Sequence, residues 1–243
     1  MSFKVKQSGK KLRPLEKMFN KVPERYDMVN RIITWGQDER WRKHAARECL
    51  SGDSSSILDL CTGTGDLALR LARFSDDTIR ISALDYSEPM LGVARRKARK
   101  KGIDRVVFTR GDAADLPYLS SSLDSVGISF AFRNLTYKNP DMGKFLSEIY
   151  RVIRDQGKFV IVESSQPKNR IVRVMFRVYL KVFVAGLAGW ISGQKGAYRY
   201  LAASARNYYE PSEIQDLLLK TGFSRVEHKP FMLGVAGLTV AVK

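Results

Sequence analysis

The sequence predicts a doubly wound α/β fold, with a mostly parallel sheet of seven strands that is closed by an antiparallel hairpin and covered by helical lid elements. Three observations predict it. From residue 57 onward, short apolar runs alternate with segments of helical periodicity, as in a parallel sheet whose crossovers are helices. A glycine-rich turn joins the first apolar run to the first of these helices. The last two runs, 224–231 and 233–242, follow each other without a helix, which indicates a hairpin.

The composition fits one large domain with an elaborated cap, residues 1–243. Hydrophobic residues make up 44% and charged residues 28%, which is ordinary for a globular protein, but the net charge of +17 is not. A field of this sign attracts nucleic acid, acidic lipid headgroups or phosphorylated substrates. The two cysteines form no disulfide framework or zinc motif, and the basic N-terminus lacks a secretion signal. We therefore expect a cytoplasmic protein without a metal site.

The elements are expected in regular order. Residues 1–50 are predicted to form a basic arm and N-terminal lid helices, with helical periodicity between Pro14 and Trp41. Strands are expected at the apolar runs 57–61, 79–84, 105–109, 125–130 and 158–162. Helices are expected at 66–74, 87–101, 141–154 and 210–221, the last of which is ended by a glycine.

Residues 166–207 interrupt this alternation and are predicted to form a helical cap that contains no acidic residue. Basic side chains recur there at helical spacing among apolar ones, at Arg170, Arg173, Arg177 and Lys181. Such a helix is typical of a membrane surface or of a cap over a lipid-like substrate. The alternative is a helix that packs on the core with its arginines in water. The longest uncharged run, 182–194, is too short to cross a membrane.

The stretch 57–66 predicts a cofactor site. An acid, Asp59, lies near the end of the strand, and the turn that follows contains Gly63, Thr64 and Gly65. A strand, a tight turn and a helix start present backbone N–H groups to a ligand, and glycine removes the Cβ that would block it. The turn also matches the dinucleotide fingerprint. However, an acid before the glycines would repel a pyrophosphate, whereas it suits the cationic amino-acid part of S-adenosylmethionine.

Further candidates follow the next three strands. Asp85 ends the second strand, where an acid can accept hydrogen bonds from both ribose hydroxyls. After the third strand, Asp112 and a nearby backbone N–H can hold the amine and ring nitrogens of an adenine. After the fourth strand, Ser129, Arg133 and Asn134 should border the transferred methyl group, because ligands lie beyond the carboxyl ends of such strands.

The same region argues against two reaction types. The Asn/Asp-Pro-Pro-aromatic pattern of N-methyltransferases is missing after the fourth strand, which counts against methylation of base amino groups. Neither cysteine lies at this strand end, where a covalent pyrimidine methylase would need its nucleophile.

Several motifs elsewhere carry a family resemblance. They are Tyr26-Asp27-Met28-Val29-Asn30, Arg133-Asn134-Leu135-Thr136, Arg151-Val152-Ile153-Arg154, Val162-Glu163-Ser164-Ser165 and Tyr198-Arg199-Tyr200-Leu201. With the glycine turn, they resemble the ubiquinone/menaquinone biosynthesis C-methyltransferases, the UbiE/MenG type of class I methyltransferase, over nearly all of the chain. The chain departs from the usual family residues at Val29, Asp38 and Asp155-Gln156, which lie at turns or in the lid.

The resemblance implies methyl transfer from S-adenosylmethionine to a ring carbon of a polyprenylated quinol, such as demethylmenaquinol. The alternative substrate is the 2-methoxy-6-polyprenyl-1,4-benzoquinol of the ubiquinone pathway. The cofactor contacts that the resemblance implies are Thr64, Asp85, Asp112, Ala113 and Ser129. To these the chemistry of the turn adds Asp59, Gly63 and Gly65.

A ring carbon becomes a good nucleophile when the neighbouring hydroxyl, with a pKa of about 10, ionises. We expect Arg133 to stabilise the resulting quinolate, with Tyr26 and Asn134 orienting it. The proton would leave through water toward Asp27 or Asp59. The alternative is that Arg133 forms a structural ion pair.

The expected partners are a lipid-soluble quinol and an anionic membrane surface, with the protein bound peripherally at its cytoplasmic face. No nucleic-acid partner is expected, and a homodimer stays open. An RNA methyltransferase is favoured by the charge alone, and a dinucleotide-dependent reductase by the fingerprint alone.

Overall fold

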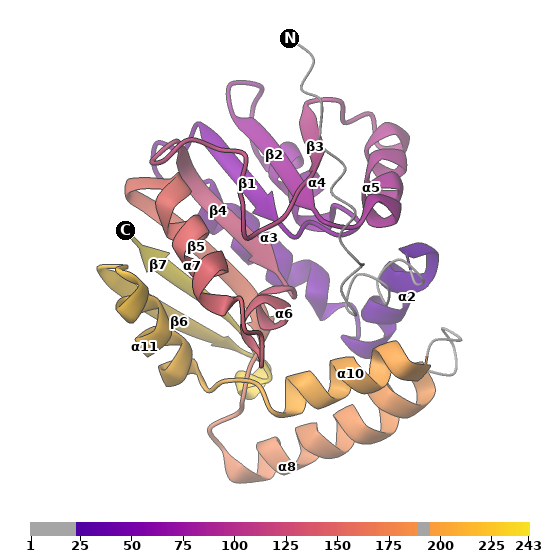
Figure 1. Cartoon of the computed structure of the whole chain (residues 1–243). Coiled ribbons are helices and arrows are strands. Elements are labelled where there is room, and N and C mark those ends of the chain that lie inside the picture. The colour runs from indigo at the N-terminus through magenta and orange to yellow at the C-terminus, as the bar shows by residue number, and fades with distance from the viewer. Residues whose placement is uncertain (1–22, 189–194) are drawn as a thin grey trace.

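A computed structural model of the chain describes residues 23–188 and 195–243. One seven-stranded sheet runs through it in the order β3-β2-β1-β4-β5-β7-β6 (Figure 1). The strands are β1 (Ser56–Leu60), β2 (Arg80–Asp85), β3 (Val106–Arg110), β4 (Leu123–Ser129), β5 (Ile153–Ser164), β6 (Arg225–Phe231) and β7 (Ala236–Val242). Strands β1 to β5 pair in parallel, and β7 pairs antiparallel with β5 and β6. The predicted fold class is confirmed.

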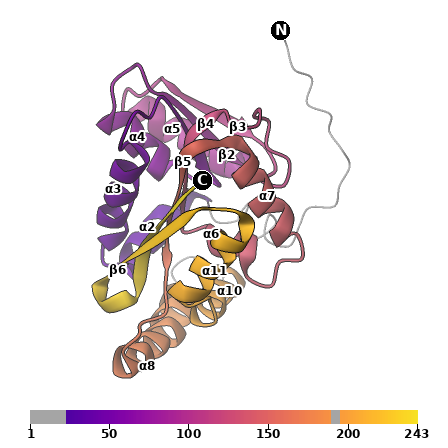
Figure 2. The same cartoon turned by 90° about the vertical axis from the view of Figure 1, so that its left-hand side faces the viewer.

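Helices cover both faces of the sheet, as Figure 2 shows edge-on. On one side lie α3 (Gln37–Cys49), α4 (Asp66–Phe74) and α5 (Glu88–Lys100). On the other side lie α6 (Phe132–Thr136), α7 (Met142–Val152) and α11 (Pro211–Thr221). The strand order reverses between β1 and β4, and ligands of such sheets bind beyond the carboxyl ends of the strands at that point.

The core fills both faces of the sheet, because strands of a parallel sheet are buried on both sides. In β1, Ile57, Leu58 and Leu60 have no exposed surface. Under α7 and α11, the rings of Phe132 and Phe159 meet edge to face with centroids 5.6 Å apart.

Helix α3 differs from its prediction as part of a lid. It continues to Cys49 and packs against α4, β4 and β5. Its buried residues Trp41, Ala45 and Cys49 recur every four positions and form one apolar stripe, which faces the sheet. The helix is therefore a layer of the main fold, and it brings side chains of its middle turns to the carboxyl end of β4.

The cap lies beyond the carboxyl ends of the strands (Figure 1). It consists of α2 (Pro23–Ile33), α8 (Arg170–Tyr179), the π-helical stretch Leu180–Ala188 and α10 (Lys195–Arg206). A small core of its own joins these segments and includes Val29, Leu180, Val184, Ala202 and Ala205. The cap therefore adds a separate apolar cluster above the sheet.

Candidate functional site

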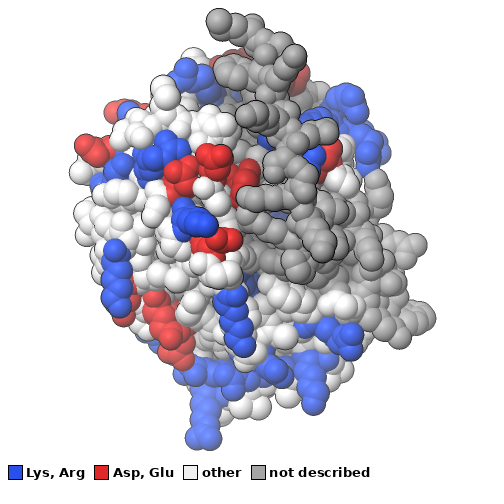
Figure 3. Space-filling model, in the orientation of Figure 1, with Lys and Arg blue, Asp and Glu red and all other residues white. Residues whose placement is uncertain are grey.

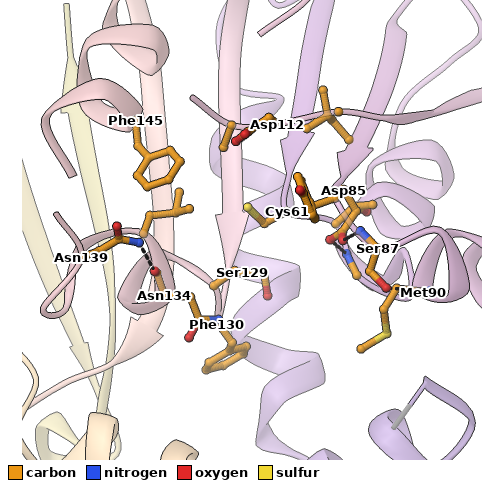
Figure 4. Close-up of a pocket in the computed structure, with 18 of the residues that line it drawn as sticks. Cys61, Asp85, Ser87, Met90, Asp112, Ser129, Phe130, Asn134, Asn139 and Phe145 are labelled. Atoms are coloured by element: carbon orange, nitrogen blue, oxygen red, sulfur yellow. Dashed lines mark hydrogen bonds between the residues drawn. The ribbon is translucent and has the colours of Figure 1, made fainter. Parts of the chain in front are cut away.

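A cavity of about 720 Å³ opens at the carboxyl ends of β1, β2, β3 and β4. In Figure 4, Asp85 and Met90 lie on one side of it, Asn134 and Phe145 lie on the other, and Ser129 lies between them. Of the predicted site residues, seven line it: Gly63, Thr64, Asp85, Asp112, Ala113, Ser129 and Asn134. The parallel register brings these residues together from distant parts of the sequence.

The glycine turn has the backbone geometry that its sequence predicts. Gly63 and Gly65 have φ of 55° and 83°, in the left-handed region that favours glycine. A Cβ on Gly63 would meet no protein atom within 4 Å and would project into open space, so this position leaves room for a ligand. A Cβ on Gly65 would lie 2.9 Å from the Ala94 Cβ, so Gly65 instead permits close packing of α4 on α5.

Asp85 joins the turn to β2. One of its oxygens accepts a hydrogen bond from the Gly63 N–H (2.7 Å), and the other accepts one from the Ser87 N–H (2.8 Å). Burial raises the pKa of the Asp85 carboxyl, and these backbone hydrogen bonds oppose that shift. Asp85 therefore lines the cavity in a fixed orientation, with lone pairs that ribose hydroxyls can share.

Two further strand ends contribute polar groups. Asp112 accepts a hydrogen bond from the Ala114 N–H (3.0 Å), which orders the loop after β3, and the buried Ala113 lies beside it in the lining. The Ser129 hydroxyl accepts a hydrogen bond from the Arg42 Nε (3.0 Å). Both loops are thus held in place by contacts within the chain.

Asp59 lies beneath the cavity, contrary to the expected contact with the methyl donor. It is 1% exposed and is not among the lining residues. Its Oδ2 accepts hydrogen bonds from the Thr62 hydroxyl (2.5 Å) and the Ala68 N–H (2.9 Å), whereas its Oδ1 has no partner. Burial raises the pKa of Asp59 to about 7. Its contacts tie the turn to the first turn of α4.

Asp27 connects the cap to the glycine turn. Its carboxylate accepts hydrogen bonds from the Thr64 hydroxyl (2.5 Å) and the Lys97 ammonium (2.6 Å), and Lys97 also pairs with Asp66. Asp27 lines a neighbouring charged cleft and not the main cavity. Tyr26 lies on α2, but its side chain is outside the part of the chain that the structure describes.

Arg133 is 4% exposed and lies behind the cavity wall. Its Nη1 donates hydrogen bonds to Glu163 (2.8 Å) and to the Ser164 hydroxyl (2.5 Å). Its backbone N–H also donates to Glu163 (3.2 Å). This is the geometry of the alternative given above, a structural ion pair, because the buried Glu163 carboxylate requires a cation beside it. Arg133 is also absent from the residues that line the cavity, contrary to the expected position beside a quinolate.

Several lining residues are not predicted by the sequence. Arg42 reaches the cavity from α3, Asp66 from the start of α4 and Tyr200 from α10. The loop after α6 adds Tyr137, Lys138, Asn139, Pro140 and Asp141. A local signal existed for Arg42, because Asp38 precedes it by four residues and forms an ion pair with it on the helix. Tyr200 belongs to the family motif Tyr198-Arg199-Tyr200-Leu201, but no local pattern predicts that it lines the cavity, since the docking of the cap places it there.

Residues 5–243 match the model of the ubiE/COQ5 methyltransferase family. The chain belongs to this family. A demethylmenaquinone methyltransferase of Thermus thermophilus is 39% identical over 92% of this chain and 98% of the relative. A ubiquinone/menaquinone biosynthesis C-methyltransferase UbiE of Geobacter sulfurreducens is 31% identical over 99% of this chain and 91% of the relative. The predicted family of S-adenosylmethionine-dependent methyltransferases is confirmed.

Solved structures share the fold. A SAM-dependent methyltransferase of Aquifex aeolicus superposes with a TM-score of 0.60 at 17% identity, covering 88% of this chain and 96% of that one. A methyltransferase of the same description from Methanococcus maripaludis also gives 0.60, at 18% identity, over 99% of this chain and 97% of that one.

The residues present fit S-adenosylmethionine. Asp85 suits the ribose hydroxyls, Asp112 and the loop beside it suit an adenine, and the open space over Gly63 accommodates a ligand at the turn. When bound, this donor supplies a methyl group on a positively charged sulfur. The carboxylates of the lining also favour a cationic ligand.

Replacing Asp59 by Asn should change how stability depends on pH. In the unfolded chain the carboxyl has its ordinary pKa and is ionised above pH 5, whereas the folded protein keeps the proton up to about pH 7. The Asp59 contribution to the free energy of unfolding should therefore fall by about 2–3 kcal/mol from pH 5 to pH 8. Urea unfolding at both values should show that Asp59→Asn loses this dependence. The exposed control Asp53→Asn should keep it.

Replacing Arg133 by Met should destabilise the protein by about 3–5 kcal/mol, because it leaves the Glu163 carboxylate buried without a cation. The double variant Arg133→Met, Glu163→Gln should recover part of this loss in urea unfolding. The exposed pair offers a control, Arg225→Met, with an expected change below about 0.5 kcal/mol. Unchanged stability with turnover abolished would instead place Arg133 in the reaction.

Proposed function

We propose that this protein transfers a methyl group from S-adenosylmethionine to a ring carbon of a polyprenylated quinol, with demethylmenaquinol as the substrate. The observation that carries the proposal is one continuous cavity that is lined by acidic residues and by apolar and aromatic residues. Asp85 and Asp112, which suit the methyl donor, line it together with apolar and aromatic residues from α6, the loop after it, α7 and α10: Leu135, Tyr137, Pro140, Phe145 and Tyr200. Figure 4 shows Asp85 and Phe145 on opposite sides of the cavity. Three relatives at 34–39% identity are named demethylmenaquinone methyltransferase.

The chain's own groups can favour the quinolate. Tyr200 lines the cavity, where burial raises the pKa of its phenol, partly offset by the nearby Arg133 charge. The phenol therefore stays protonated and can donate a hydrogen bond to an anionic ring oxygen. Asn134 lines the same wall, and its backbone carbonyl accepts a hydrogen bond from Asn139 (2.9 Å) that fixes the loop. The quinol hydroxyl first gives its proton to water. A carbon–carbon bond then forms as the methyl–sulfur bond breaks, and the ring carbon loses its proton to water while the ring oxygen regains one.

The substrate assignment is tested with purified protein and methyl-labelled S-adenosylmethionine. Label should enter reduced demethylmenaquinone in a product that carries one added methyl group, identified by mass spectrometry. Because the two fused rings of demethylmenaquinol have more apolar surface to bury against the apolar wall than a single ring has, we expect a rate at least about tenfold higher than with the benzoquinol of the ubiquinone pathway.

Tyr200→Phe removes the hydroxyl that would donate a hydrogen bond to the ring oxygen. It should lower label incorporation by about 10- to 100-fold and leave donor binding unchanged. Faster methylation of the benzoquinol would move the protein to the ubiquinone pathway. Label in total RNA but in neither quinol would contradict the proposal.

We also propose that α8 docks on an anionic membrane surface. Its outward side chains are apolar and exposed at Ile171, Val174, Met175 and Val178, and the stretch after it adds Val182. Arg170, Arg177 and Lys181 lie among them, and Figure 3 shows basic side chains along the lower edge of the molecule, where α8 lies. Arg173 differs from the predicted basic stripe, because it turns inward to pair with Glu210 (3.0 Å).

Two neighbouring loops extend this face. Leu233 is 79% exposed at the tip of the β6–β7 hairpin, and the hairpin approaches Pro167 at the start of α8. Trp35 is 78% exposed in the turn after α2, and the last residue of α2 contacts α8, because the Tyr179 hydroxyl donates a hydrogen bond to the Ile33 carbonyl. No helix in the described residues is long and apolar enough to span a bilayer. The composition therefore favours a helix lying in the interface.

Vesicle sedimentation tests the docking face. The wild-type protein should bind vesicles of phosphatidylglycerol and phosphatidylcholine and dissociate as salt rises, because basic side chains contribute to binding. Ile171→Ser with Leu233→Ser should lower the partition coefficient at least about tenfold, since each substitution removes apolar surface that the bilayer would bury. Leu119→Ser removes a side chain that is 81% exposed beyond the opposite end of the sheet, and it should bind normally. A salt-stable dimer that the double variant abolishes would assign this face to a second copy instead.

A further inference from the structure

Arg42 lies in the wall of the cavity, although nothing in the reaction described above uses it. It extends from α3, and its side chain is 7% exposed. Its Nε donates a hydrogen bond to the Ser129 hydroxyl (3.0 Å), and its guanidinium carbon lies 5.2 Å from the centre of the Phe130 ring. Two lining residues at the end of β4 thus hold the guanidinium at the cavity.

The charges around the cavity make this position unusual. Four of the described lining residues are acids, Asp66, Asp85, Asp112 and Asp141, whereas the cations of the described lining are Arg42 and Lys138. Lys138 belongs to the loop after α6, on the side of the cap. Within the described lining, Arg42 is therefore the cation at the end of β4. Lys97 lies 3.3 Å from the Thr64 hydroxyl of the glycine turn, but it is outside the lining and pairs with Asp27 and Asp66.

The methyl donor carries such a carboxylate at the end opposite its adenosine. Asp85 and Asp112 mark the adenosine end, at the carboxyl ends of β2 and β3. The amino-acid end therefore extends past the Gly63 turn toward the end of β4, where Arg42 is hydrogen-bonded to Ser129. Guanidinium groups bind carboxylates strongly in water-poor sites, since the planar fork matches the two oxygens and keeps its proton.

We infer that Arg42 binds the α-carboxylate of S-adenosylmethionine and selects donors that carry the amino-acid group. Asp38 positions it: this buried carboxylate is four residues earlier on α3, pairs with Arg42 Nη1, and accepts a hydrogen bond from the Thr34 hydroxyl (2.9 Å). Asp66, whose Oδ2 is 3.7 Å from the Arg42 Nη1, adds a carboxylate that suits the neighbouring ammonium group.

A purely structural role for Arg42 would have a different signature. A residue that only stabilises the wall would affect every ligand of the cavity alike. A residue that binds the carboxylate should affect S-adenosylhomocysteine but not 5′-methylthioadenosine, which has the same adenosine and sulfur without the amino-acid group. The ratio of the two affinities therefore separates the two roles, whatever the change in stability.

Isothermal titration of the purified protein with both nucleosides is the test. Wild-type protein should prefer S-adenosylhomocysteine. Arg42→Met should weaken S-adenosylhomocysteine binding by roughly 10- to 100-fold and leave 5′-methylthioadenosine within about twofold, because a charge-assisted contact is lost. Arg42→Lys, which keeps the charge without the fork, should lose less and provides the measurement if Arg42→Met does not fold. Arg40→Met, at an exposed position of the same helix outside the cavity lining, is the matched control and should leave both affinities unchanged.

Equal weakening of both nucleosides, or no change in the S-adenosylhomocysteine affinity, would overturn this role of Arg42. A wild-type protein that bound neither nucleoside would instead overturn the donor site as a whole. Failure of the quinol assay with normal donor binding would leave the Arg42 result standing, so the two proposals fail separately.

Discussion

The buried carboxylate of Asp59 determines the shape of the glycine turn, and the cavity depends on that turn. A single oxygen accepts a hydrogen bond from Thr62 in the turn and another from Ala68 in the first turn of α4. Asp85, at the end of β2, also holds the turn, because its carboxyl accepts a hydrogen bond from the Gly63 N–H. The two acids thus hold both ends of the loop in place. This is needed because glycine has the widest backbone freedom and does not itself restrict the conformation of the loop.

This arrangement separates two functions that one motif combines. Asp59 and Gly65 work inside the fold, one through hydrogen bonds and the other by allowing α4 to approach Ala94. Gly63 and Thr64 face the cavity. A motif that signals ligand binding therefore contains residues that build the site and residues that line it, and only the folded chain distinguishes them.

The sequence predicted the fold well because its signals are local. Apolar runs, the glycine turn and the cap of α5 at Ser87 each act within a few residues. The acids and Ser129 at strand ends were also predictable, since parallel strands place their carboxyl ends side by side.

Positions that depend on distant partners were not predictable. Arg133 points away from the cavity because Glu163, thirty residues later, is buried beside it. Tyr200 reaches the cavity only because α10 docks above it. Arg42 belongs to a helix expected in the lid, whose apolar stripe instead packs on the sheet. In each case the contact that sets the position of the residue joins segments that are far apart in the sequence.

The charge of the chain likewise has two uses. Lys97, Arg42 and Arg133 each pair with carboxylates around the cavity, so these cations balance local acids. The cations of α8 lie mostly on the outer surface. On the face shown in Figure 3, basic side chains gather along the lower edge, over the cap, and others lie toward the top of the molecule.

The attachment of α2 to the glycine turn differs in kind from the rest of the fold. It consists of a hydrogen bond from Thr64 to Asp27 and an ion pair of Asp27 with Lys97, whose side chains are 33% and 20% exposed, whereas the layers of the sheet are joined by fully buried apolar side chains. Dissolved ions weaken contacts of the first kind and leave the second nearly untouched. The ionic strength of the surroundings therefore acts on the ion pair between Asp27 and Lys97, while the apolar cluster around Val29 and the sheet beneath keep their form.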